Sequence, residues 1–92
     1  MRESSIEHRF VNRVKKAGGL CWKFTAPGIS GVPDRIVMLP PGRIFFVELK
    51  RQGGIVSDVQ KTRLQELTAR NINARVCIGV EGIEEFFRDV GI

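Results

Sequence analysis

The pattern of hydrophobic and polar positions along the chain predicts four strands and three helices. Short apolar or alternating runs bounded by glycine and proline predict strands, and apolar residues that recur every three or four positions predict helices. The expected strands cover residues 20–24, 35–39, 44–50 and 74–80. The expected helices run from residue 4 to about 17, from 58 to about 69 and from 82 to 90. The last strand follows a helix, so we expect it to pair in parallel with an earlier strand.

The second and third strands, joined by a Pro-Pro-Gly turn, carry the most informative pattern. Alternate side chains of the third strand point to opposite faces, and both faces are largely apolar, which is typical of a strand covered on both sides. Glu48 and Lys50 share one of these faces. Asp34 precedes the second strand, so in an antiparallel hairpin it lies opposite the Glu48 end of the third strand.

Each of these charged residues has an ordinary explanation when it is taken alone. Pro33-Asp34 is common in turns, and Glu48 with Lys50 fits an ion pair at a strand end. Their convergence on a buried strand is harder to explain, because burying charged groups is costly. Two carboxylates and an ammonium group at one point suit metal-assisted hydrolysis of a phosphodiester: carboxylates bind Mg²⁺, and the ammonium positions the attacking water.

The same residues resemble a known family. Asp34…Glu48-Leu49-Lys50 resembles the PD-(D/E)xK nuclease signature, and the surrounding segments 31–35 and 46–50 are similar to the VRR-NUC (virus-type replication-repair nuclease) domain. The resemblance covers nearly the whole chain. It implies an α/β fold with a restriction-endonuclease-like αβββαβ core, a mixed four-stranded sheet flanked by helices, plus a C-terminal helix. We expect one domain over residues 1–92.

The resemblance also implies a metal-dependent site. Asp34, Glu48 and the backbone carbonyl of Leu49 would bind Mg²⁺, for which Mn²⁺ can substitute. Lys50 would position the nucleophilic water and stabilise the charge that develops in the transition state. The products would carry a 5′-phosphate and a 3′-hydroxyl.

Glu7 and Gln60 each have two explanations, and the sequence leaves both open. The resemblance places Glu7 at the metal, directly or through water, and places Gln60 beside Lys50 as a residue that orients the lysine or the water. Ser4-x-x-Glu7 and Ser57-x-x-Gln60 also fit the capping box, in which the side chain at the third helical position reaches back to the helix N-terminus.

The charge distribution favours a polyanionic partner. The net charge is +5; residues 1–80 carry 14 Lys and Arg against 6 Asp and Glu, and the last twelve carry one against four. We therefore expect a basic body with a separate acidic C-terminal helix. The loop 26–31 is expected to be mobile until substrate binds. The expected DNA contacts are Lys15, Lys16, Lys23, Arg35, Arg51 and Lys61.

Other residues are assigned to the interior or to solvent. We expect Trp22 to belong to the core and not to stack on a base, Cys21 and Cys77 to be buried and reduced, and His8 to be solvated. No apolar run approaches the length needed to span a bilayer. We expect a cytoplasmic protein, in a bacterial cell or a phage-infected host, without a small-molecule cofactor.

The sequence thus predicts a magnesium-dependent, structure-selective DNA endonuclease that acts as a homodimer on branched DNA such as four-way (Holliday) junctions. A dimer would present two sites to a symmetric junction, and four apolar residues lie outside the expected core elements: Ile29, Ile55, Val56 and Ile92. One alternative is a non-catalytic or weakly catalytic nucleic-acid-binding module with a nuclease-like fold. The other is a protein-interaction domain whose basic patch is incidental. Metal-dependent cleavage would separate the first alternative from a nuclease, and salt-dependent DNA binding would separate the second from both.

Overall fold

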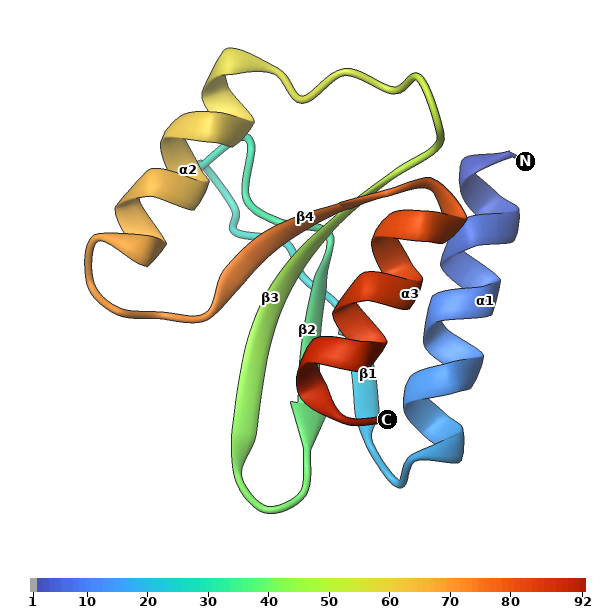
Figure 1. Ribbon diagram of the computed structural model, residues 1–92. Coiled ribbons are helices and arrows are strands. Elements are labelled where there is room, and N and C mark those ends of the chain that lie inside the picture. Colours follow the sequence, from blue (N-terminus) through green and yellow to red (C-terminus); the bar gives the residue numbers. More distant parts are fainter. Residues whose placement is uncertain (1) are drawn as a thin grey trace.

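A computed structural model describes residues 2–92, and in it helices lie on both faces of a four-stranded sheet (Figure 1). The strands lie in the order β1-β2-β3-β4. The first three are antiparallel, and β4 pairs in parallel with β3 after the crossover through α2. This confirms the predicted α/β class, the element order and the mixed sheet. The elements are α1 Glu3–Lys16, β1 Leu20–Lys23, β2 Arg35–Leu39, β3 Arg43–Lys50, α2 Asp58–Thr68, β4 Ala74–Ile78 and α3 Gly79–Val90.

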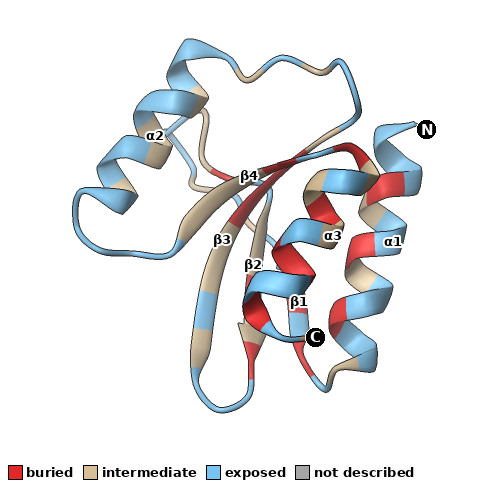
Figure 2. Cartoon of the chain, viewed as in Figure 1, coloured by how far each residue is buried: buried red, intermediate tan, exposed pale blue. Residues whose placement is uncertain are grey.

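The hydrophobic core lies between the sheet and the helices α1 and α3, which run side by side on one face (Figure 1). Three phenylalanines from the two helices form its centre: Phe10 lies 5.4 Å from Phe86 and 5.5 Å from Phe87, measured between ring centroids. Aromatic contacts of this kind stabilise a fold by about 0.5–1.5 kcal/mol each beyond the area they bury. Figure 2 shows the buried positions concentrated on this side of the sheet.

The boundary between β4 and α3 and the start of α1 differ from the prediction. Strand β4 ends at Ile78 and α3 begins at Gly79, whereas we expected the strand to reach residue 80 and the helix to begin at 82. Gly79 has a φ of 67°, a conformation that glycine adopts at little cost, so the chain turns directly from strand into helix. Helix α1 begins at Glu3 after Arg2, so Ser4 lies inside the first turn and not at the cap.

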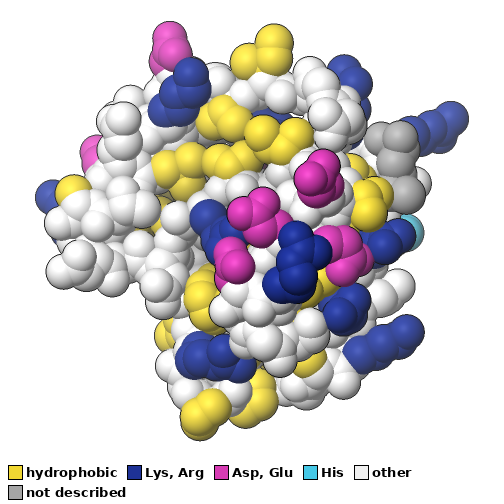
Figure 3. Space-filling view, viewed as in Figure 1, with side chains coloured by type: hydrophobic (Ala, Val, Ile, Leu, Met, Phe, Trp, Pro, Cys, Tyr) yellow, Lys and Arg dark blue, Asp and Glu magenta, His cyan; other side chains and the backbone are white. Residues whose placement is uncertain are grey.

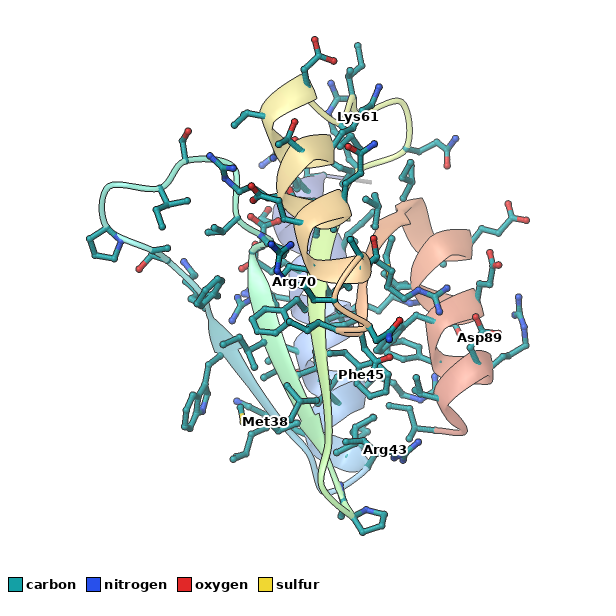
Figure 4. The ribbon with its side chains drawn as sticks, turned by 90° about the vertical axis from the view of Figure 1, so that its left-hand side faces the viewer. Met38, Arg43, Phe45, Lys61, Arg70 and Asp89 are labelled. Carbon is teal, nitrogen blue, oxygen red and sulfur yellow. The ribbon has the colours of Figure 1, made fainter. Side chains whose placement is uncertain are left out.

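The prediction that Trp22 belongs to the core is wrong, because its side chain is 58% exposed. Strand β1 lies at one edge of the sheet, whereas α2 packs against β4 at the other edge, so the outward face of β1 is left open. Leu20 and Ile44 are also about half exposed on this face, at 52% and 51%. In Figure 4 Met38 projects on this open side, while Phe45 points toward α3.

Cys21 and Cys77 are both buried and both free of disulfide bonds. His8 is exposed. Within residues 2–92, the structure contains no helix with the length and apolar character that a membrane crossing requires.

Candidate active site

The ends of strands β2 and β3 bring Asp34 and Glu48 together. The last paired residues of the two strands are Arg35 and Val47, so Asp34 stands opposite Glu48 one step further along. The Leu49 backbone N–H donates a hydrogen bond of 3.1 Å to Asp34 Oδ2. A strand residue that donates toward one neighbour also turns its carbonyl to that side. The Leu49 carbonyl therefore faces the same region as the Asp34 carboxylate.

Glu48 is a buried carboxylate, with only 2% of the residue exposed. Gln60 Nε2 donates to Glu48 Oε2 over 3.1 Å, and Lys50 Nζ lies 3.7 Å from the same oxygen. Glu48 Oε1 is buried and has no hydrogen-bond partner among residues 2–92. Burial raises the pKa of Glu48 to about 7, and the negative charge of Asp34 adds to this increase, while Lys50 opposes it.

These two carboxylates fit a divalent cation. A buried oxygen without a partner is costly, and Mg²⁺ binds hard oxygen ligands of this kind. Asp34 is exposed, so a cation can approach it from solvent. Residues 2–92 contain no cluster of three or more His, Cys, Asp or Glu side chains that could hold a metal. A cation bound by Asp34 and Glu48 would therefore complete its shell with backbone oxygen or water.

Gln60 forms the capping box and also hydrogen-bonds Glu48, whereas the other explanation placed it beside Lys50 to orient the lysine or the water. Its backbone N–H donates to Ser57 Oγ over 3.2 Å and its Oε1 accepts from the Ser57 backbone N–H over 2.9 Å, which completes a capping box. An amide side chain has both an acceptor and donors. The Nε2 end of the same side chain is therefore free to donate to Glu48. The capping box thus fixes the position of the Gln60 amide, which hydrogen-bonds the buried Glu48 carboxylate.

Glu7 forms no capping box, because no side chain within residues 2–92 caps the N-terminus of α1. Its carboxylate instead forms an ion pair with Arg35. Glu7, Asp34 and Lys23 line one cavity of about 300 Å³. The structure thus brings Glu7 to the same cavity as Asp34, but not into a cluster of three carboxylates with Asp34 and Glu48.

Arg35 does not lie on the surface where we expected it to contact DNA. Its side chain is only 11% exposed and is held by Glu7. Alternation along β2 places Arg35 on the opposite face from Asp34 and on the same face as the buried Val37 and Leu39. That face lies against α1, from which Glu7 reaches it. The alternation of side chains along β2 was sufficient to place Arg35 on the face opposite to Asp34. We expected a DNA contact because Arg35 is close in sequence to Asp34.

A sequence model of the VRR-NUC domain matches residues 1–81. The chain belongs to this family. It is 55% identical over 53 residues to a protein described as "Putative nuclease p44" from Acyrthosiphon pisum secondary endosymbiont phage 1, and the match covers 58% of this chain and 57% of that relative. The chain thus spans little more than half the length of this relative.

Solved structures agree with the family. A structure described as a VRR_NUC domain is 28% identical, with a TM-score of 0.87 and 94% of each chain covered. The fold is also shared with a second VRR_NUC domain protein, at 16% identity, a TM-score of 0.75 and 97% and 87% coverage of this chain and of that one. Hjc from Archaeoglobus fulgidus, a Holliday junction resolvase, has the fold at 17% identity, with a TM-score of 0.60 and 83% and 67% coverage.

The other expected DNA contacts of this VRR-NUC domain are exposed and lie at different places on the molecule. Lys23 lines the cavity beside Asp34, and Arg51 directly follows the end of β3. Lys61 lies in the first part of α2, on the outside of the molecule (Figure 4). Lys15 and Lys16 lie in the last turn of α1. With a rise of about 1.5 Å per residue, they stand roughly 12 Å along the helix from Glu7.

The acidic C-terminal helix of this VRR-NUC domain is not a separate acidic region as predicted. Its side chains form ion pairs with basic residues of α1 and β4: Glu84 with Arg9 at 3.0 Å and with Arg13 at 3.7 Å, and Asp89 with Arg75 at 2.9 Å. Figure 3 shows the two signs of charge intermixed on this side. The α3 side therefore offers no uniformly positive surface to DNA.

The loop between β1 and β2 is attached to α2, although we expected it to be mobile. Arg63 Nε donates to the Ser30 carbonyl over 2.8 Å. Gly31, with a φ of 80°, lies so close to Val59 that an added Cβ would approach it to 3.0 Å. These contacts position the loop that leads into Asp34, and Arg63 was not assigned this role from the sequence.

Proposed function

We propose that this VRR-NUC domain is a Mg²⁺-dependent DNA endonuclease, with Asp34, Glu48 and the Leu49 carbonyl as ligands of the metal. The observation that carries the proposal is the buried Glu48 oxygen that has no hydrogen-bond partner within residues 2–92, on a carboxylate that stands opposite Asp34. A structural ion pair with Lys50 does not account for it, because Lys50 and Gln60 both contact the other oxygen of Glu48.

The protein groups around the site have separate tasks. Asp34 is held by the Leu49 N–H, and Glu48 is held by Gln60, so neither carboxylate has to be ordered when the metal binds. A bound Mg²⁺ would polarise the scissile phosphate. Lys50, beside Glu48, positions the attacking water and offsets the negative charge that develops on the phosphate.

Cleavage of labelled DNA tests this function. Duplex, flap and four-way substrates are incubated with Mg²⁺, with Mn²⁺ and with chelator, and Asp34→Asn serves as the matched control. We expect metal-dependent cleavage by the wild type and none by the variant. DNA binding should weaken with salt, with a slope of about −0.9 for each phosphate contact on duplex DNA. Salt-dependent binding without cleavage would favour the alternative of a nucleic-acid-binding module.

We further propose that the domain acts as a homodimer on branched DNA. The likeness of its fold to Hjc, a Holliday junction resolvase, supports the choice of substrate. Of the apolar residues that motivated the dimer, Ile29 and Ile55 are 52% and 83% exposed, whereas Ile92 is partly buried and packs against the core. The exposed Trp22 adds to the apolar surface.

Light scattering at micromolar concentration, combined with competition between four-way and linear DNA, tests this assembly. We expect a dimer that prefers the junction. A Trp22→Ser variant should dissociate more readily if the open face of β1 contributes to the interface. A monomer that cuts both substrates equally would contradict the proposal.

A further inference from the structure

The ion pair between Glu7 and Arg35 links α1 to the start of β2, directly beside the proposed metal site. Arg35 follows Asp34 in the chain, and Glu7 and Asp34 line the same cavity. The Glu7 side chain is 31% exposed and that of Arg35 only 11%. Arg35 Nε is buried and has no hydrogen-bond partner within residues 2–92. Within the described residues, Glu7 is the carboxylate that pairs with this guanidinium.

This ion pair competes with metal binding. Glu7 Oε1 accepts a charge-assisted hydrogen bond from Arg35, so this oxygen is less available to a second cation. The positive charge of Arg35 also opposes the approach of a divalent ion. Among Glu7, Asp34, Glu48, Lys50 and Arg35, the site carries one net negative charge, and without Arg35 it would carry two. Both effects predict that removal of Arg35 strengthens metal binding.

We propose that Arg35 is a positioning residue that withholds Glu7 from the metal and so keeps the affinity of the DNA-free protein for divalent cations moderate. The inference rests on the proposed function, because it takes Asp34 and Glu48 as the metal ligands. It also explains why the arginine next to the first ligand lies on the α1 face of the sheet, opposite to the Asp34 side chain. Arg35 acts through Glu7, not on the substrate.

Calorimetric titration with Mn²⁺ in the absence of DNA tests the inference without measuring activity. The proteins are the wild type, Arg35→Met, Glu7→Gln and the double variant. We expect Arg35→Met to bind Mn²⁺ at least about fivefold more tightly, the lower end of typical coupling between sites. In the Glu7→Gln background the gain should be clearly smaller, because only the effect of the Arg35 charge remains. Arg70→Met removes an exposed charge from the turn after α2 (Figure 4) and controls for the change in net charge; it should match the wild type.

Two results would overturn this inference and leave the proposed function unaffected. One is an Arg35→Met affinity equal to or weaker than that of the wild type. The other is an equal gain with and without Glu7, which would mean that Arg35 acts by its charge and not through Glu7. If Arg35→Met does not fold, Arg35→Lys carries the test. Lysine is not an equivalent of arginine at such a site, because it cannot form the planar contact. We expect it to bind Mn²⁺ more tightly than the wild type, and an unchanged affinity would contradict the inference.

The proposed function has its own readout in the same experiment. Asp34→Asn should abolish Mn²⁺ binding whether or not Arg35 is present. A wild-type protein that binds no Mn²⁺ would overturn the proposed function together with this inference. A wild type that binds Mn²⁺ and cleaves DNA, while Arg35→Met leaves the affinity unchanged, would overturn only the role of Arg35.

Discussion

The two faces of the sheet are covered by helices that bury very different sets of side chains. Helix α1 buries Ile6, Phe10 and Val14, and α3 buries five residues, whereas α2 buries none (Figure 2). The α1 and α3 side therefore supplies the hydrophobic core. On the other side, α2 packs against β4, and it is also attached through the loop before β2 and through the contact of Gln60 with Glu48.

Strand β3 belongs to both faces, and this shows how a small domain separates stability from chemistry. Val47 and Leu49 point into the core, and Glu48 and Lys50 point to the α2 side. Neighbouring residues of β3 thus alternate between the hydrophobic core and the α2 side. The packed face holds the backbone rigid, and the thinly packed face can accommodate a buried carboxylate that would be costly in a hydrophobic core.

The largest effect should come from the carboxylates of the α2 side. Asp34→Asn and Glu48→Gln should each reduce cleavage by more than the roughly 10- to 100-fold that residues behind metal ligands typically contribute, because both are proposed ligands. The fold should persist, because neither side chain belongs to the core. Cleavage rates and circular dichroism measure the two parts of the prediction. Cleavage by either variant at a wild-type rate would remove that residue from the site.

A substitution in the core on the α1 and α3 side should instead reduce the stability of the fold. Phe86→Ala should lower the free energy of unfolding by about 3–5 kcal/mol, the usual cost of removing a buried phenylalanine. Leu64→Ala on α2 should cost much less, because Leu64 is only partly buried. Denaturant unfolding of the two variants measures the difference. Equal losses would show that α2 contributes as much to stability as the core helices.

Gln60 both caps α2 and hydrogen-bonds Glu48, and two variants can separate these roles. Ser57→Ala removes the oxygen that caps α2 and should cost about 1 kcal/mol of stability, with cleavage retained. Gln60→Ala loses the cap contact and also the hydrogen bond to Glu48, so cleavage should fall by about 10- to 100-fold. Melting temperature and cleavage rate are measured for both. If cleavage falls equally in the two variants, Gln60 acts only through the helix.

The smallest effect concerns the stability of the metal-free protein as pH changes. The pKa of Glu48 is raised from its ordinary value of 4.5 to about 7 by burial and by Asp34. The folded protein therefore holds this proton more tightly than the unfolded chain. Its stabilising contribution is fully present below a pH of about 4.5 and is lost as the pH rises through about 7.

Melting temperatures in chelator, measured between about pH 5 and pH 8, test this for the wild type and for Glu48→Gln. The wild type should lose stability relative to the variant as the pH rises, because a glutamine does not titrate. Parallel curves for the two proteins would contradict the raised pKa.

Local pattern was sufficient for the elements, their order and the placement of Asp34 opposite Glu48. These features depend on the alternation of a strand, on turn residues and on the antiparallel hairpin, all of which act over a few neighbouring positions. The motif spacing was also sufficient to indicate the VRR-NUC family. The capping box of α2 followed from four consecutive residues, although its second contact with Glu48 did not.

The tertiary structure alone decided which helix covers which part of the sheet, and the errors follow from this. Trp22 is exposed because α2 packs at the other edge of the sheet. Two acids of α3, Glu84 and Asp89, form ion pairs because α1 and β4 lie beside them. Arg35 reaches Glu7 across 28 positions of sequence. Contacts between distant segments depend on the packing of whole elements and on the reach of long side chains, neither of which is encoded in the local pattern of hydrophobic and polar residues.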